Sequence, residues 1–277
     1  MSDSVKYGSG GSVSLVPFLY GVCARDEMPG TILTALLGDL GLTTAAARAL
    51  IARMRRDGQL AGRRRGRTVD YRMIGEFRRQ YDRIRTSDSR QPVPWRGHFH
   101  ALLFQVPEEH RAFRDALRRH AVFTGYGTMQ PGVLISLTDR RSALLDQLPP
   151  LPSGARVVSA TLGMSTVDAA AAAHRAWDLG ALAERYRAHI LTLTPETRRD
   201  EPLPADGRTL RRWSDLTTTM WRDIGMQPDL SPELLPDDWP GKRLLELLIA
   251  MDRRYYPAVR TYVDELFSAS SAPATDP

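Results

Sequence analysis

The sequence predicts an α+β protein built from three parts, and three observations along the chain support that prediction. An arginine-rich segment near the N-terminus changes from helical to strand periodicity at Gln59. The middle of the chain alternates short strands and helices in the order β-α-β-β-α-β, and the last third carries apolar stripes at helical spacing. We therefore expect an N-terminal domain over residues 12–86, a middle domain over 95–165, a helical C-terminal domain over 166–268, and disordered tails at 1–11 and 269–277.

The bulk composition favours a soluble globular protein. Of the 277 residues, 42% are hydrophobic and 25% are charged, as in ordinary globular domains. No apolar run approaches the roughly 20 residues that a membrane-spanning helix needs, so we expect no membrane partner. The apolar stretch from Val13 to Ala24 resembles a secretory signal, but Pro17 and Tyr20 interrupt it. The single cysteine excludes an intramolecular disulfide, and we expect a cytoplasmic protein that needs no cofactor.

Three helices are predicted in the first part of the N-terminal domain. The first covers residues 12–24, and the second places Pro29 in its first turn and ends at Gly41. A tight turn follows, with Thr43 as the expected N-cap of a third helix that reaches Arg56. The apolar positions of this third helix recur at i, i+3, i+4 and i+7 and define an inward face: Ala47, Leu50, Ile51 and Met54. Two helices joined by so short a turn predict a helix-turn-helix.

A β-hairpin is predicted after the third helix. Val69, Tyr71 and Met73 alternate with polar residues, and the segment from Arg63 to Arg67 forms the tip. A fourth helix, from Gly75 to Thr86, closes the domain. The order of helix, short turn, helix and hairpin is that of a winged helix-turn-helix, in which the hairpin is the wing.

Positive charge is concentrated on the third helix and the hairpin. Nine arginines and two aspartates lie between Arg48 and Arg72, a balance of +7 in 25 residues, whereas the whole chain carries +6. So local an excess favours a polyanionic partner. The alternative is an ordinary helical bundle with a solvated basic face, which the order of the elements and the scarcity of acidic residues disfavour.

Double-stranded DNA is the expected partner. An α-helix fits the major groove, where a helix-turn-helix presents its second helix, and the wing lies along the backbone or enters the minor groove. Arginine suits both tasks because its planar guanidinium matches phosphates and guanine edges. Thr44, Ala45 and Arg48 are the residues expected to reach base edges most easily. The predicted DNA-binding residues are Thr43, Thr44, Arg48, Arg53, Arg55, Arg56, Arg63, Arg64, Arg65 and Arg67.

The middle domain is expected to be a ferredoxin-like sandwich, because its elements follow the order of that fold. We predict a strand at residues 95–104, a helix at 107–120, and two paired strands within 125–136. A second helix at 140–148 and a last strand at 156–164 follow.

Helices dominate the C-terminal domain. They are predicted at residues 166–190, 209–224 and 242–267, with a turn-rich segment at 228–241. Three tryptophans of this domain can line an aromatic pocket, although burial in the core is favoured: Trp213, Trp221 and Trp239.

Several distinctive sequence blocks lie in the middle and C-terminal domains. The most specific is Leu-Leu-Pro-Asp-Asp-Trp-Pro-Gly at residues 234–241, within a longer segment that begins at Trp221. The middle domain contains Trp95-Arg-Gly-x-Phe, Leu103-Phe-Gln-Val-Pro-Glu108, Arg114-x-x-Leu-Arg118 and Gly125-Tyr-Gly-x-Met-x-Pro-Gly-Val133. Together with Gly38-Asp and Arg56-Asp-Gly in the N-terminal domain, these blocks resemble the PaaX family of phenylacetate-degradation repressors. The resemblance covers residues 12–267.

This resemblance implies a homodimeric repressor that leaves its operator when it binds an aryl-coenzyme A thioester or a related acyl-CoA, typically phenylacetyl-CoA. Such a ligand can shift the protein away from its DNA-binding arrangement only by binding another arrangement better. A two-fold dimer requires a roughly palindromic operator. The sequence does not identify the residues that bind the effector.

Two groups of residues suggest enzymatic sites, and each has a structural alternative. His98 and His100 lie two apart on a predicted strand and project from one face, as metal ligands would. No nearby acid or cysteine completes a ligand set at familiar spacing, although His110 and His120 can approach in space, and a polar strand face is favoured. Asp237 and Asp238 are adjacent between prolines, which favours a turn over a pair of catalytic carboxylates. No phosphate-binding loop or nucleophile-elbow motif occurs.

The middle domain also resembles the small ferredoxin-like nuclease of CRISPR adaptation, whose first strand ends in a metal-binding aspartate. The matching position here is Gln105. Glutamine lacks the negative charge that holds a divalent cation and activates water. We therefore interpret the protein as a regulator and not an enzyme, with a metal-dependent nuclease as the alternative.

Overall fold

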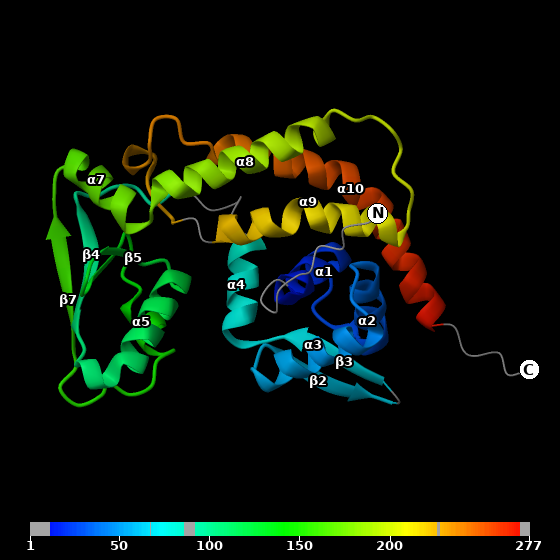
Figure 1. Cartoon of the computed structure of the whole chain (residues 1–277), viewed down its shortest axis with the longest axis horizontal. Coiled ribbons are helices and arrows are strands. Elements are labelled where there is room, and N and C mark those ends of the chain that lie inside the picture. Colours follow the sequence, from blue (N-terminus) through cyan, green and yellow to red (C-terminus); the bar gives the residue numbers. More distant parts are fainter. Residues whose placement is uncertain (1–11, 67, 86–91, 226–227, 272–277) are drawn as a thin grey trace, which may run out of the picture. The chain divides into compact units, whose positions relative to one another are not determined.

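The computed structural model describes residues 12–66, 68–85, 92–225 and 228–271 (Figure 1). These residues form helices and two antiparallel sheets, which confirms the α+β class. Of the tails predicted to be disordered at 1–11 and 269–277, residues 1–11 and 272–277 lie outside the described residues. The chain divides into two compact units: unit 1 comprises Met1–Asp88, His189–Arg222 and Arg243–Pro277, and unit 2 comprises Ser89–Ala188 and Asp223–Lys242.

Three helices open unit 1, as the sequence predicts. They are α1 (Leu15–Cys23), α2 (Gly30–Asp39) and α3 (Thr44–Arg56), and the short 3-10 helix Ser12–Ser14 precedes them. Thr43 is the N-cap of α3, because its side-chain oxygen accepts a hydrogen bond from the backbone N–H of Ala46 at 3.2 Å. The inward face of α3 is also confirmed by the buried residues Ala47, Leu50, Ile51 and Met54.

The predicted hairpin consists of β2 (Leu60–Arg65) and β3 (Thr68–Met73), and the two-residue strand β1 (Met28–Pro29) pairs with the other side of β3. The prediction that Pro29 lies in the first turn of α2 is wrong. Its backbone is extended, with φ −56° and ψ 136°, and it pairs with Asp70 of β3. Proline has no N–H to donate, so it is tolerated on an edge strand. Helix α4 (Gly75–Arg85) follows the hairpin.

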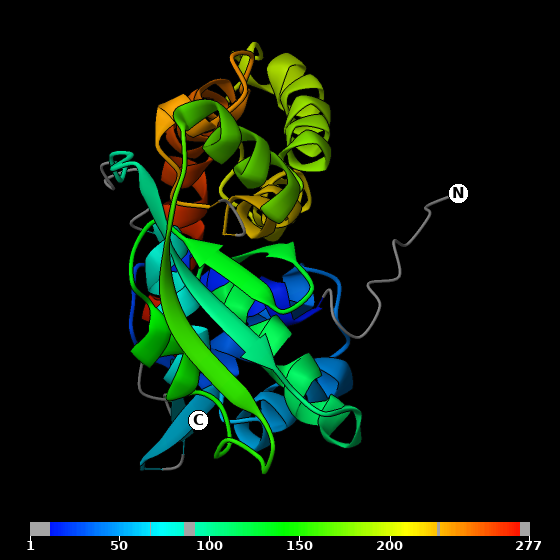
Figure 2. The ribbon, with the colours of Figure 1, turned by 90° about the vertical axis from the view of Figure 1, so that its left-hand side faces the viewer.

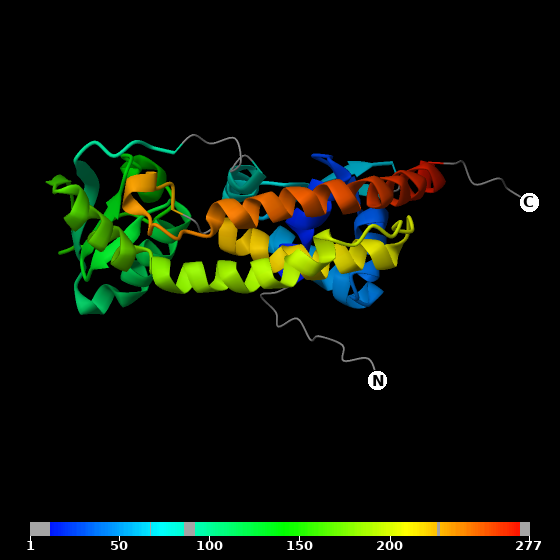
Figure 3. The same ribbon diagram turned by 90° about the horizontal axis from the view of Figure 1, so that it is seen from above.

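Three long helices, α8 (Leu179–Thr197), α9 (Gly207–Gly225) and α10 (Gly241–Ser271), run side by side (Figures 1 and 3). Each of them contributes residues to both units. The prediction that residues 269–271 are disordered is wrong, because α10 continues to Ser271. No helix in the described part of the chain is long and apolar enough to cross a membrane.

The helix predicted over residues 166–190 is in fact two helices, α7 (Thr166–Ala176) and α8. Asp178, between them, has a left-handed φ of 47°, which ends α7. The neighbouring Trp177 packs 6.2 Å from the ring of Phe99 and against Gly127, where a Cβ would lie 2.6 Å from the indole. Asp178 also caps α8, because its carboxylate accepts a hydrogen bond from the backbone N–H of Ala181 at 3.4 Å. This local cap and the tertiary packing of Trp177 together explain the break in an alanine-rich stretch.

Unit 2 contains a four-stranded antiparallel sheet of β4 (His98–Gln105), β5 (Gly127–Gln130), β6 (Val133–Ser136) and β7 (Arg156–Gly163) (Figure 2). The strand order is β5-β6-β4-β7. A 3-10 helix (Glu108–His110) and α5 (Arg111–Phe123) follow β4, and α6 (Arg141–Leu145) follows β6. The predicted β-α-β-β-α-β order along the chain is therefore confirmed.

Each face of this sheet carries a separate hydrophobic core. Leu102 and Phe104 of β4 pack with residues of α5 and α6. Phe99 and Ala101, on the opposite face, pack with residues of α7 and with the 3-10 helix Pro232–Leu234. Helix α7 therefore belongs to unit 2, and the compact units differ from the three ranges predicted along the sequence.

Candidate nucleic-acid interface

Helix α3 presents its polar side to solvent. Among the DNA-binding residues predicted at the N-cap and on the helix, the exposed ones are Thr43, Thr44, Arg48, Arg55 and Arg56. Arg53 is half-buried and takes part in an interaction within the chain. The exposed positions between them hold only Ala45, Ala46, Ala49 and Ala52. Small side chains let a helix approach base pairs closely, and alanine contacts the methyl group of thymine.

A groove with a volume of about 770 Å³ lies between α2, α3 and β3. The guanidinium of Arg55 lies 5.9 Å from the ring centre of Tyr71, which connects α3 with the hairpin. Sequence reasoning missed the wall that α2 contributes, because it carries no basic residue and its one charged residue, Asp39, lies at the end of the helix. The only sequence feature that could have indicated this wall is that its residues lie on the face of α2 opposite its buried apolar residues. The lining residues are Gly30, Thr31, Thr34, Ala35, Gly38 and Asp39 of α2, Thr44, Arg48, Ile51, Ala52 and Arg55 of α3, and Thr68, Val69 and Tyr71 of β3.

The hairpin carries exposed arginines beside this groove. Arg63, Arg64 and Arg65 occupy successive exposed positions of β2, and Arg67 lies outside the described residues. Asp70 of β3 is only 6% exposed, and its carboxylate lies 3.7 Å from the guanidinium of Arg65. The acidic group of the hairpin is therefore buried, while its arginines face solvent.

The turn between α2 and α3 is held by α9 and α10. The hydroxyl of Tyr262 donates a hydrogen bond to Asp39, the last residue of α2, at 2.7 Å. Gly207, the first residue of α9, lies so close that a Cβ there would be 2.7 Å from Asp39 Oδ1. Burial raises the pKa of Asp39, although the hydrogen bond from Tyr262 opposes that rise. No local pattern signals these contacts, since Asp39 and Tyr262 are 223 positions apart.

Gly41→Ala is expected to lower the free energy of unfolding by about 1–2 kcal/mol, because Gly41 is left-handed, with φ 95°, and side chains are strained there. A Cβ would also lie 2.9 Å from the guanidinium of Arg211, which would have to move. Gly38→Ala is the matched control, since Gly38 is exposed, helical and has nothing within 4 Å of a Cβ. It is expected to stabilise by about 0.5 kcal/mol. Thermal unfolding measures both, and shifts of the same sign would contradict this account of the turn.

The two histidines of β4 lie close together. The rings of His98 and His100 are 5.5 Å apart between centroids, and His98 Nδ1 lies 3.1 Å from the carbonyl oxygen of Arg96. Within the described ranges, no three histidine, cysteine, aspartate or glutamate residues are placed to hold a metal ion.

The structure also places the other residues considered for catalysis. Gln105 is the last residue of β4, at the predicted strand end, and its partner in β7 is Arg156. Asp237 and Asp238 form a turn before α10, as predicted, and Asp238 is paired with Arg187. An uncharged amide beside a guanidinium favours neither a divalent cation nor its bound water.

Two of the three tryptophans considered for a pocket pack against other rings, and the third, Trp221 of α9, is half-buried. Trp213 is buried in unit 1, with its ring 5.5 Å from that of Phe18 and 6.1 Å from that of Tyr255. Trp239, in unit 2, is half-buried and its ring lies 5.4 Å from that of Tyr186. The core interpretation is confirmed for Trp213.

Two family models match the chain. The model for the PaaX protein central Cas2-like domain matches residues 92–171, and the model for the PaaX-like protein C-terminal domain matches residues 177–265. Together they cover more than half of the chain, and both ranges follow the arginine-rich helix and hairpin. No curated protein matches the sequence. Among solved structures, the uncharacterized protein Rv0674 from Mycobacterium tuberculosis is similar in fold, with 22% identity, a TM-score of 0.53, and coverage of 89% of this chain and 97% of that chain.

Proposed function

Because the chain belongs to the PaaX family, we propose that it is a transcriptional regulator that binds double-stranded DNA through α3 and the β2–β3 hairpin. One observation carries the DNA-binding part of this proposal: Arg48 and Arg55 line an open groove next to a hairpin whose arginines are exposed and whose aspartate is buried. The acidic residue in the lining of this groove is Asp39, whose carboxylate accepts a hydrogen bond from Tyr262. A phosphate backbone approaching the surface would therefore meet several exposed arginines and little negative charge. A DNA partner would place the protein in the cytoplasm, as the sequence predicts.

In this proposal, residues 12–86 form a winged helix-turn-helix, with α3 as the recognition helix and β2–β3 as the wing. The element order and the buried inward face of α3 support it. The sheet within residues 95–165 is assigned as ferredoxin-like, and residues 166–268 as the effector and dimerisation domain. Support for the ferredoxin-like assignment comes from the strand order, in which the first strand of the chain segment, β4, lies between the third and the fourth.

Each arginine has a role that follows from its position. Thr44 and Arg48, at the N-terminal half of α3, are assigned to base edges, where arginine recognises guanine. The C-terminal arginines of α3 and those of the hairpin are assigned to phosphates, which positions the protein without specifying sequence. The phosphate-binding set is Arg53, Arg55, Arg56, Arg63, Arg64, Arg65 and Arg67, with Thr43 at the start of α3 contacting the backbone.

We also propose that the protein is a homodimeric repressor released from its operator by phenylacetyl-CoA or a related acyl-CoA. This part rests on family membership. The contact of α10 with the end of α2, through Tyr262 and Asp39, offers a physical link from the C-terminal helices to the recognition helix. A ligand that shifts α10 would change the support of that helix.

The test of DNA binding is a titration with duplexes selected from a random pool. If six arginines each neutralise one phosphate, affinity is expected to fall about 1000-fold between roughly 0.05 and 0.2 M salt. Binding that does not depend on salt would contradict the proposal. Cleavage of the duplex on incubation with Mg²⁺ or Mn²⁺ would revive the nuclease alternative.

The effector test adds phenylacetyl-CoA to the preformed complex, with coenzyme A and phenylacetate as separate controls. Release of DNA by the thioester, together with a higher unfolding temperature of the free protein, is the expected result. If the thioester stabilises the protein but leaves the DNA complex intact, the protein binds the thioester without releasing DNA. That result would contradict the proposed regulation.

A further inference from the structure

The C-terminal half of α10 contacts the ends of both helices that precede α3. Arg260 donates a hydrogen bond to the backbone carbonyl of Cys23, the last residue of α1, at 2.8 Å. Tyr262 donates one to the carboxylate of Asp39, the last residue of α2, at 2.7 Å. The last carbonyl groups of a helix lack partners within it, and a cation is favourable there. Helix α10 therefore holds α1 and α2 at their C-terminal ends.

Further contacts of α10 in this region involve an aromatic ring and buried apolar residues. The guanidinium of Arg25, which closely follows α1, lies 4.2 Å from the ring centre of Phe267. Val259 and Val263 of α10 have no exposed surface. All of these residues belong to unit 1. The N-terminal helices and this half of α10 are therefore packed as parts of one compact unit.

The contact with Asp39 lies close to the start of α3. Only a short turn separates Asp39 from Thr43, the N-cap of α3. Leu40 in this turn is 2% exposed, and the backbone N–H of Leu42 donates to the carbonyl of Leu37 at 3.0 Å. So short and well bonded a turn leaves little conformational freedom between the two helices. A displacement of Asp39 would therefore also displace Thr43 and the first turn of α3.

Asp39 is an unexpected residue for a surface that binds DNA. Its side chain lines the groove between α2, α3 and β3, where a carboxylate repels phosphates. The hydrogen bond from Tyr262 joins this carboxylate to α10. The close approach of Gly207, at which a Cβ would lie 2.7 Å from Asp39 Oδ1, places it against α9 as well. A role in anchoring the end of α2 explains an acid at this position.

We propose that Tyr262 is a positioning residue for DNA recognition. Through Asp39 it fixes the N-terminal end of α3, and with it Thr44 and Arg48, against the C-terminal helices. Hydrogen bonds to base edges require closer alignment than ionic contacts with phosphates. Tyr262 therefore acts on the choice of sequence and not on the number of phosphates bound. This inference rests on the proposed DNA-binding function and names a residue outside 12–86 on which recognition depends.

Tyr262→Phe tests this role, because it removes only the hydroxyl. The measurement is the ratio of two affinities, one for the duplex selected from a random pool and one for an unrelated duplex of equal length. This ratio is expected to fall about threefold to tenfold, the range that loss of one hydrogen bond allows. The slope of log affinity against log salt is expected to stay at its wild-type value, since every arginine is retained. A variant that were merely less stable would lose affinity for both duplexes alike.

Thr261→Val is the matched control on the same helix. Thr261 is exposed, and its hydroxyl donates only to the carbonyl of Pro257 within α10, at 3.1 Å. This variant is expected to keep the wild-type ratio. Asp39→Ala is expected to lower the ratio as much as Tyr262→Phe does, and the double variant is expected to lower it no further, because both residues act through one contact. A wild-type ratio in Tyr262→Phe, or additive effects of the two substitutions, would overturn the role of Tyr262.

Amide hydrogen exchange of the free protein tests the same contact without DNA. Tyr262→Phe is expected to speed exchange at Gly41 and Leu42 about threefold to tenfold, while the amides of β2 and β3 keep their wild-type rates. Unchanged exchange in the turn would contradict the anchoring of α2 by α10. Faster exchange in a chain that binds no duplex would sustain the anchoring and refute the proposed function.

Discussion

Replacing both Arg63 and Arg64 with alanine is expected to weaken duplex binding about 30-fold at about 0.15 M salt, because two lost phosphate contacts lower the dependence of log affinity on log salt by about 1.8. Both side chains are exposed, so the fold is expected to persist. Arg65 is retained because it lies 3.7 Å from the buried carboxylate of Asp70, which would otherwise lose this partner. Titrations at several salt concentrations measure the affinity and the slope.

The matched control is Arg118→Ala with Arg119→Ala on α5, which removes the same charge from exposed positions of unit 2. This variant is expected to keep the wild-type slope. Equal weakening by both variants would show that net charge and not the hairpin governs binding. Wild-type affinity in the hairpin variant would refute the assignment of β2–β3 as a wing.

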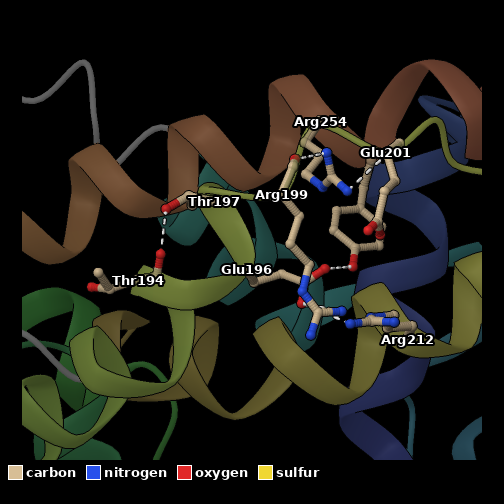
Figure 4. Close-up of polar contacts among 8 residues, drawn as sticks. Thr194, Glu196, Thr197, Arg199, Glu201, Arg212 and Arg254 are labelled. Carbon is tan, nitrogen blue, oxygen red and sulfur yellow. Dashed lines mark hydrogen bonds and ion pairs between the residues drawn. The ribbon is translucent and has the colours of Figure 1, made fainter.

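Glu196→Ala is expected to lower the free energy of unfolding by about 3 kcal/mol and the unfolding temperature by roughly 6–12 °C. Glu196 of α8 is 8% exposed and lies between α9 and α10 (Figure 4). It accepts hydrogen bonds from the hydroxyl of Tyr255 at 2.5 Å and from Arg212 at 2.8 Å, and Arg199 lies at 3.8 Å. Arg254 donates to the backbone carbonyl of Arg199 and secures the segment that follows α8. Both arginines that face the carboxylate are half-exposed, so we expect a loss in the free energy of unfolding at the low end of the range for breaking a buried ion pair.

The effect of Glu196→Ala is expected to depend on pH. Burial alone would raise the pKa of Glu196, but hydrogen bonds from Tyr255 and Arg212, with the charges of Arg212 and Arg199, outweigh it and hold the pKa below its ordinary value. A carboxylate with a depressed pKa stabilises the fold above the unfolded-state pKa, and this contribution is lost as pH falls through the folded-state pKa. The loss in the free energy of unfolding caused by Glu196→Ala is therefore expected in full above about pH 5 and is expected to shrink below about pH 4.

Glu184→Ala provides the control on the same helix. Glu184 is exposed and pairs with Arg187 at 2.6 Å, and exposed pairs contribute little. A change below about 0.5 kcal/mol is expected. Comparable unfolding midpoints for Glu184→Ala and Glu196→Ala would show that the Glu196 contacts do not hold the three helices together.

Local signals predicted the recognition helix well. The N-cap Thr43 and the buried stripe of α3 depend on residues within three or four positions of one another, which the sequence displays directly. The hairpin was equally visible, because a period of two and a glycine at the tip are local properties. The same holds for the order of strands and helices in unit 2.

Other features depend on contacts between distant residues. The break between α7 and α8 combines a local signal, the cap that Asp178 provides for α8, with the packing of Trp177 against Gly127, which is 50 positions away. Charge alone does not distinguish Arg55, which is exposed, from Arg53, which is half-buried. The α2 wall of the groove carries no basic residue, and its one charged residue, Asp39, is held by Tyr262 of α10.

The sequence by itself determined the local elements, the concentration of arginines and the family, since caps, periodicity, charge and motifs act over short stretches of chain. The tertiary structure alone decided which arginines share a groove, that Asp70 is buried, and that Tyr262 and Glu196 join α10 to α2 and α8. It also decided that β5 and β7 are the outer strands of the described sheet in unit 2 and that Trp177 packs over Gly127 of β5. These outcomes depend on which surfaces exclude water together, and that is settled only when segments far apart in the chain pack against one another.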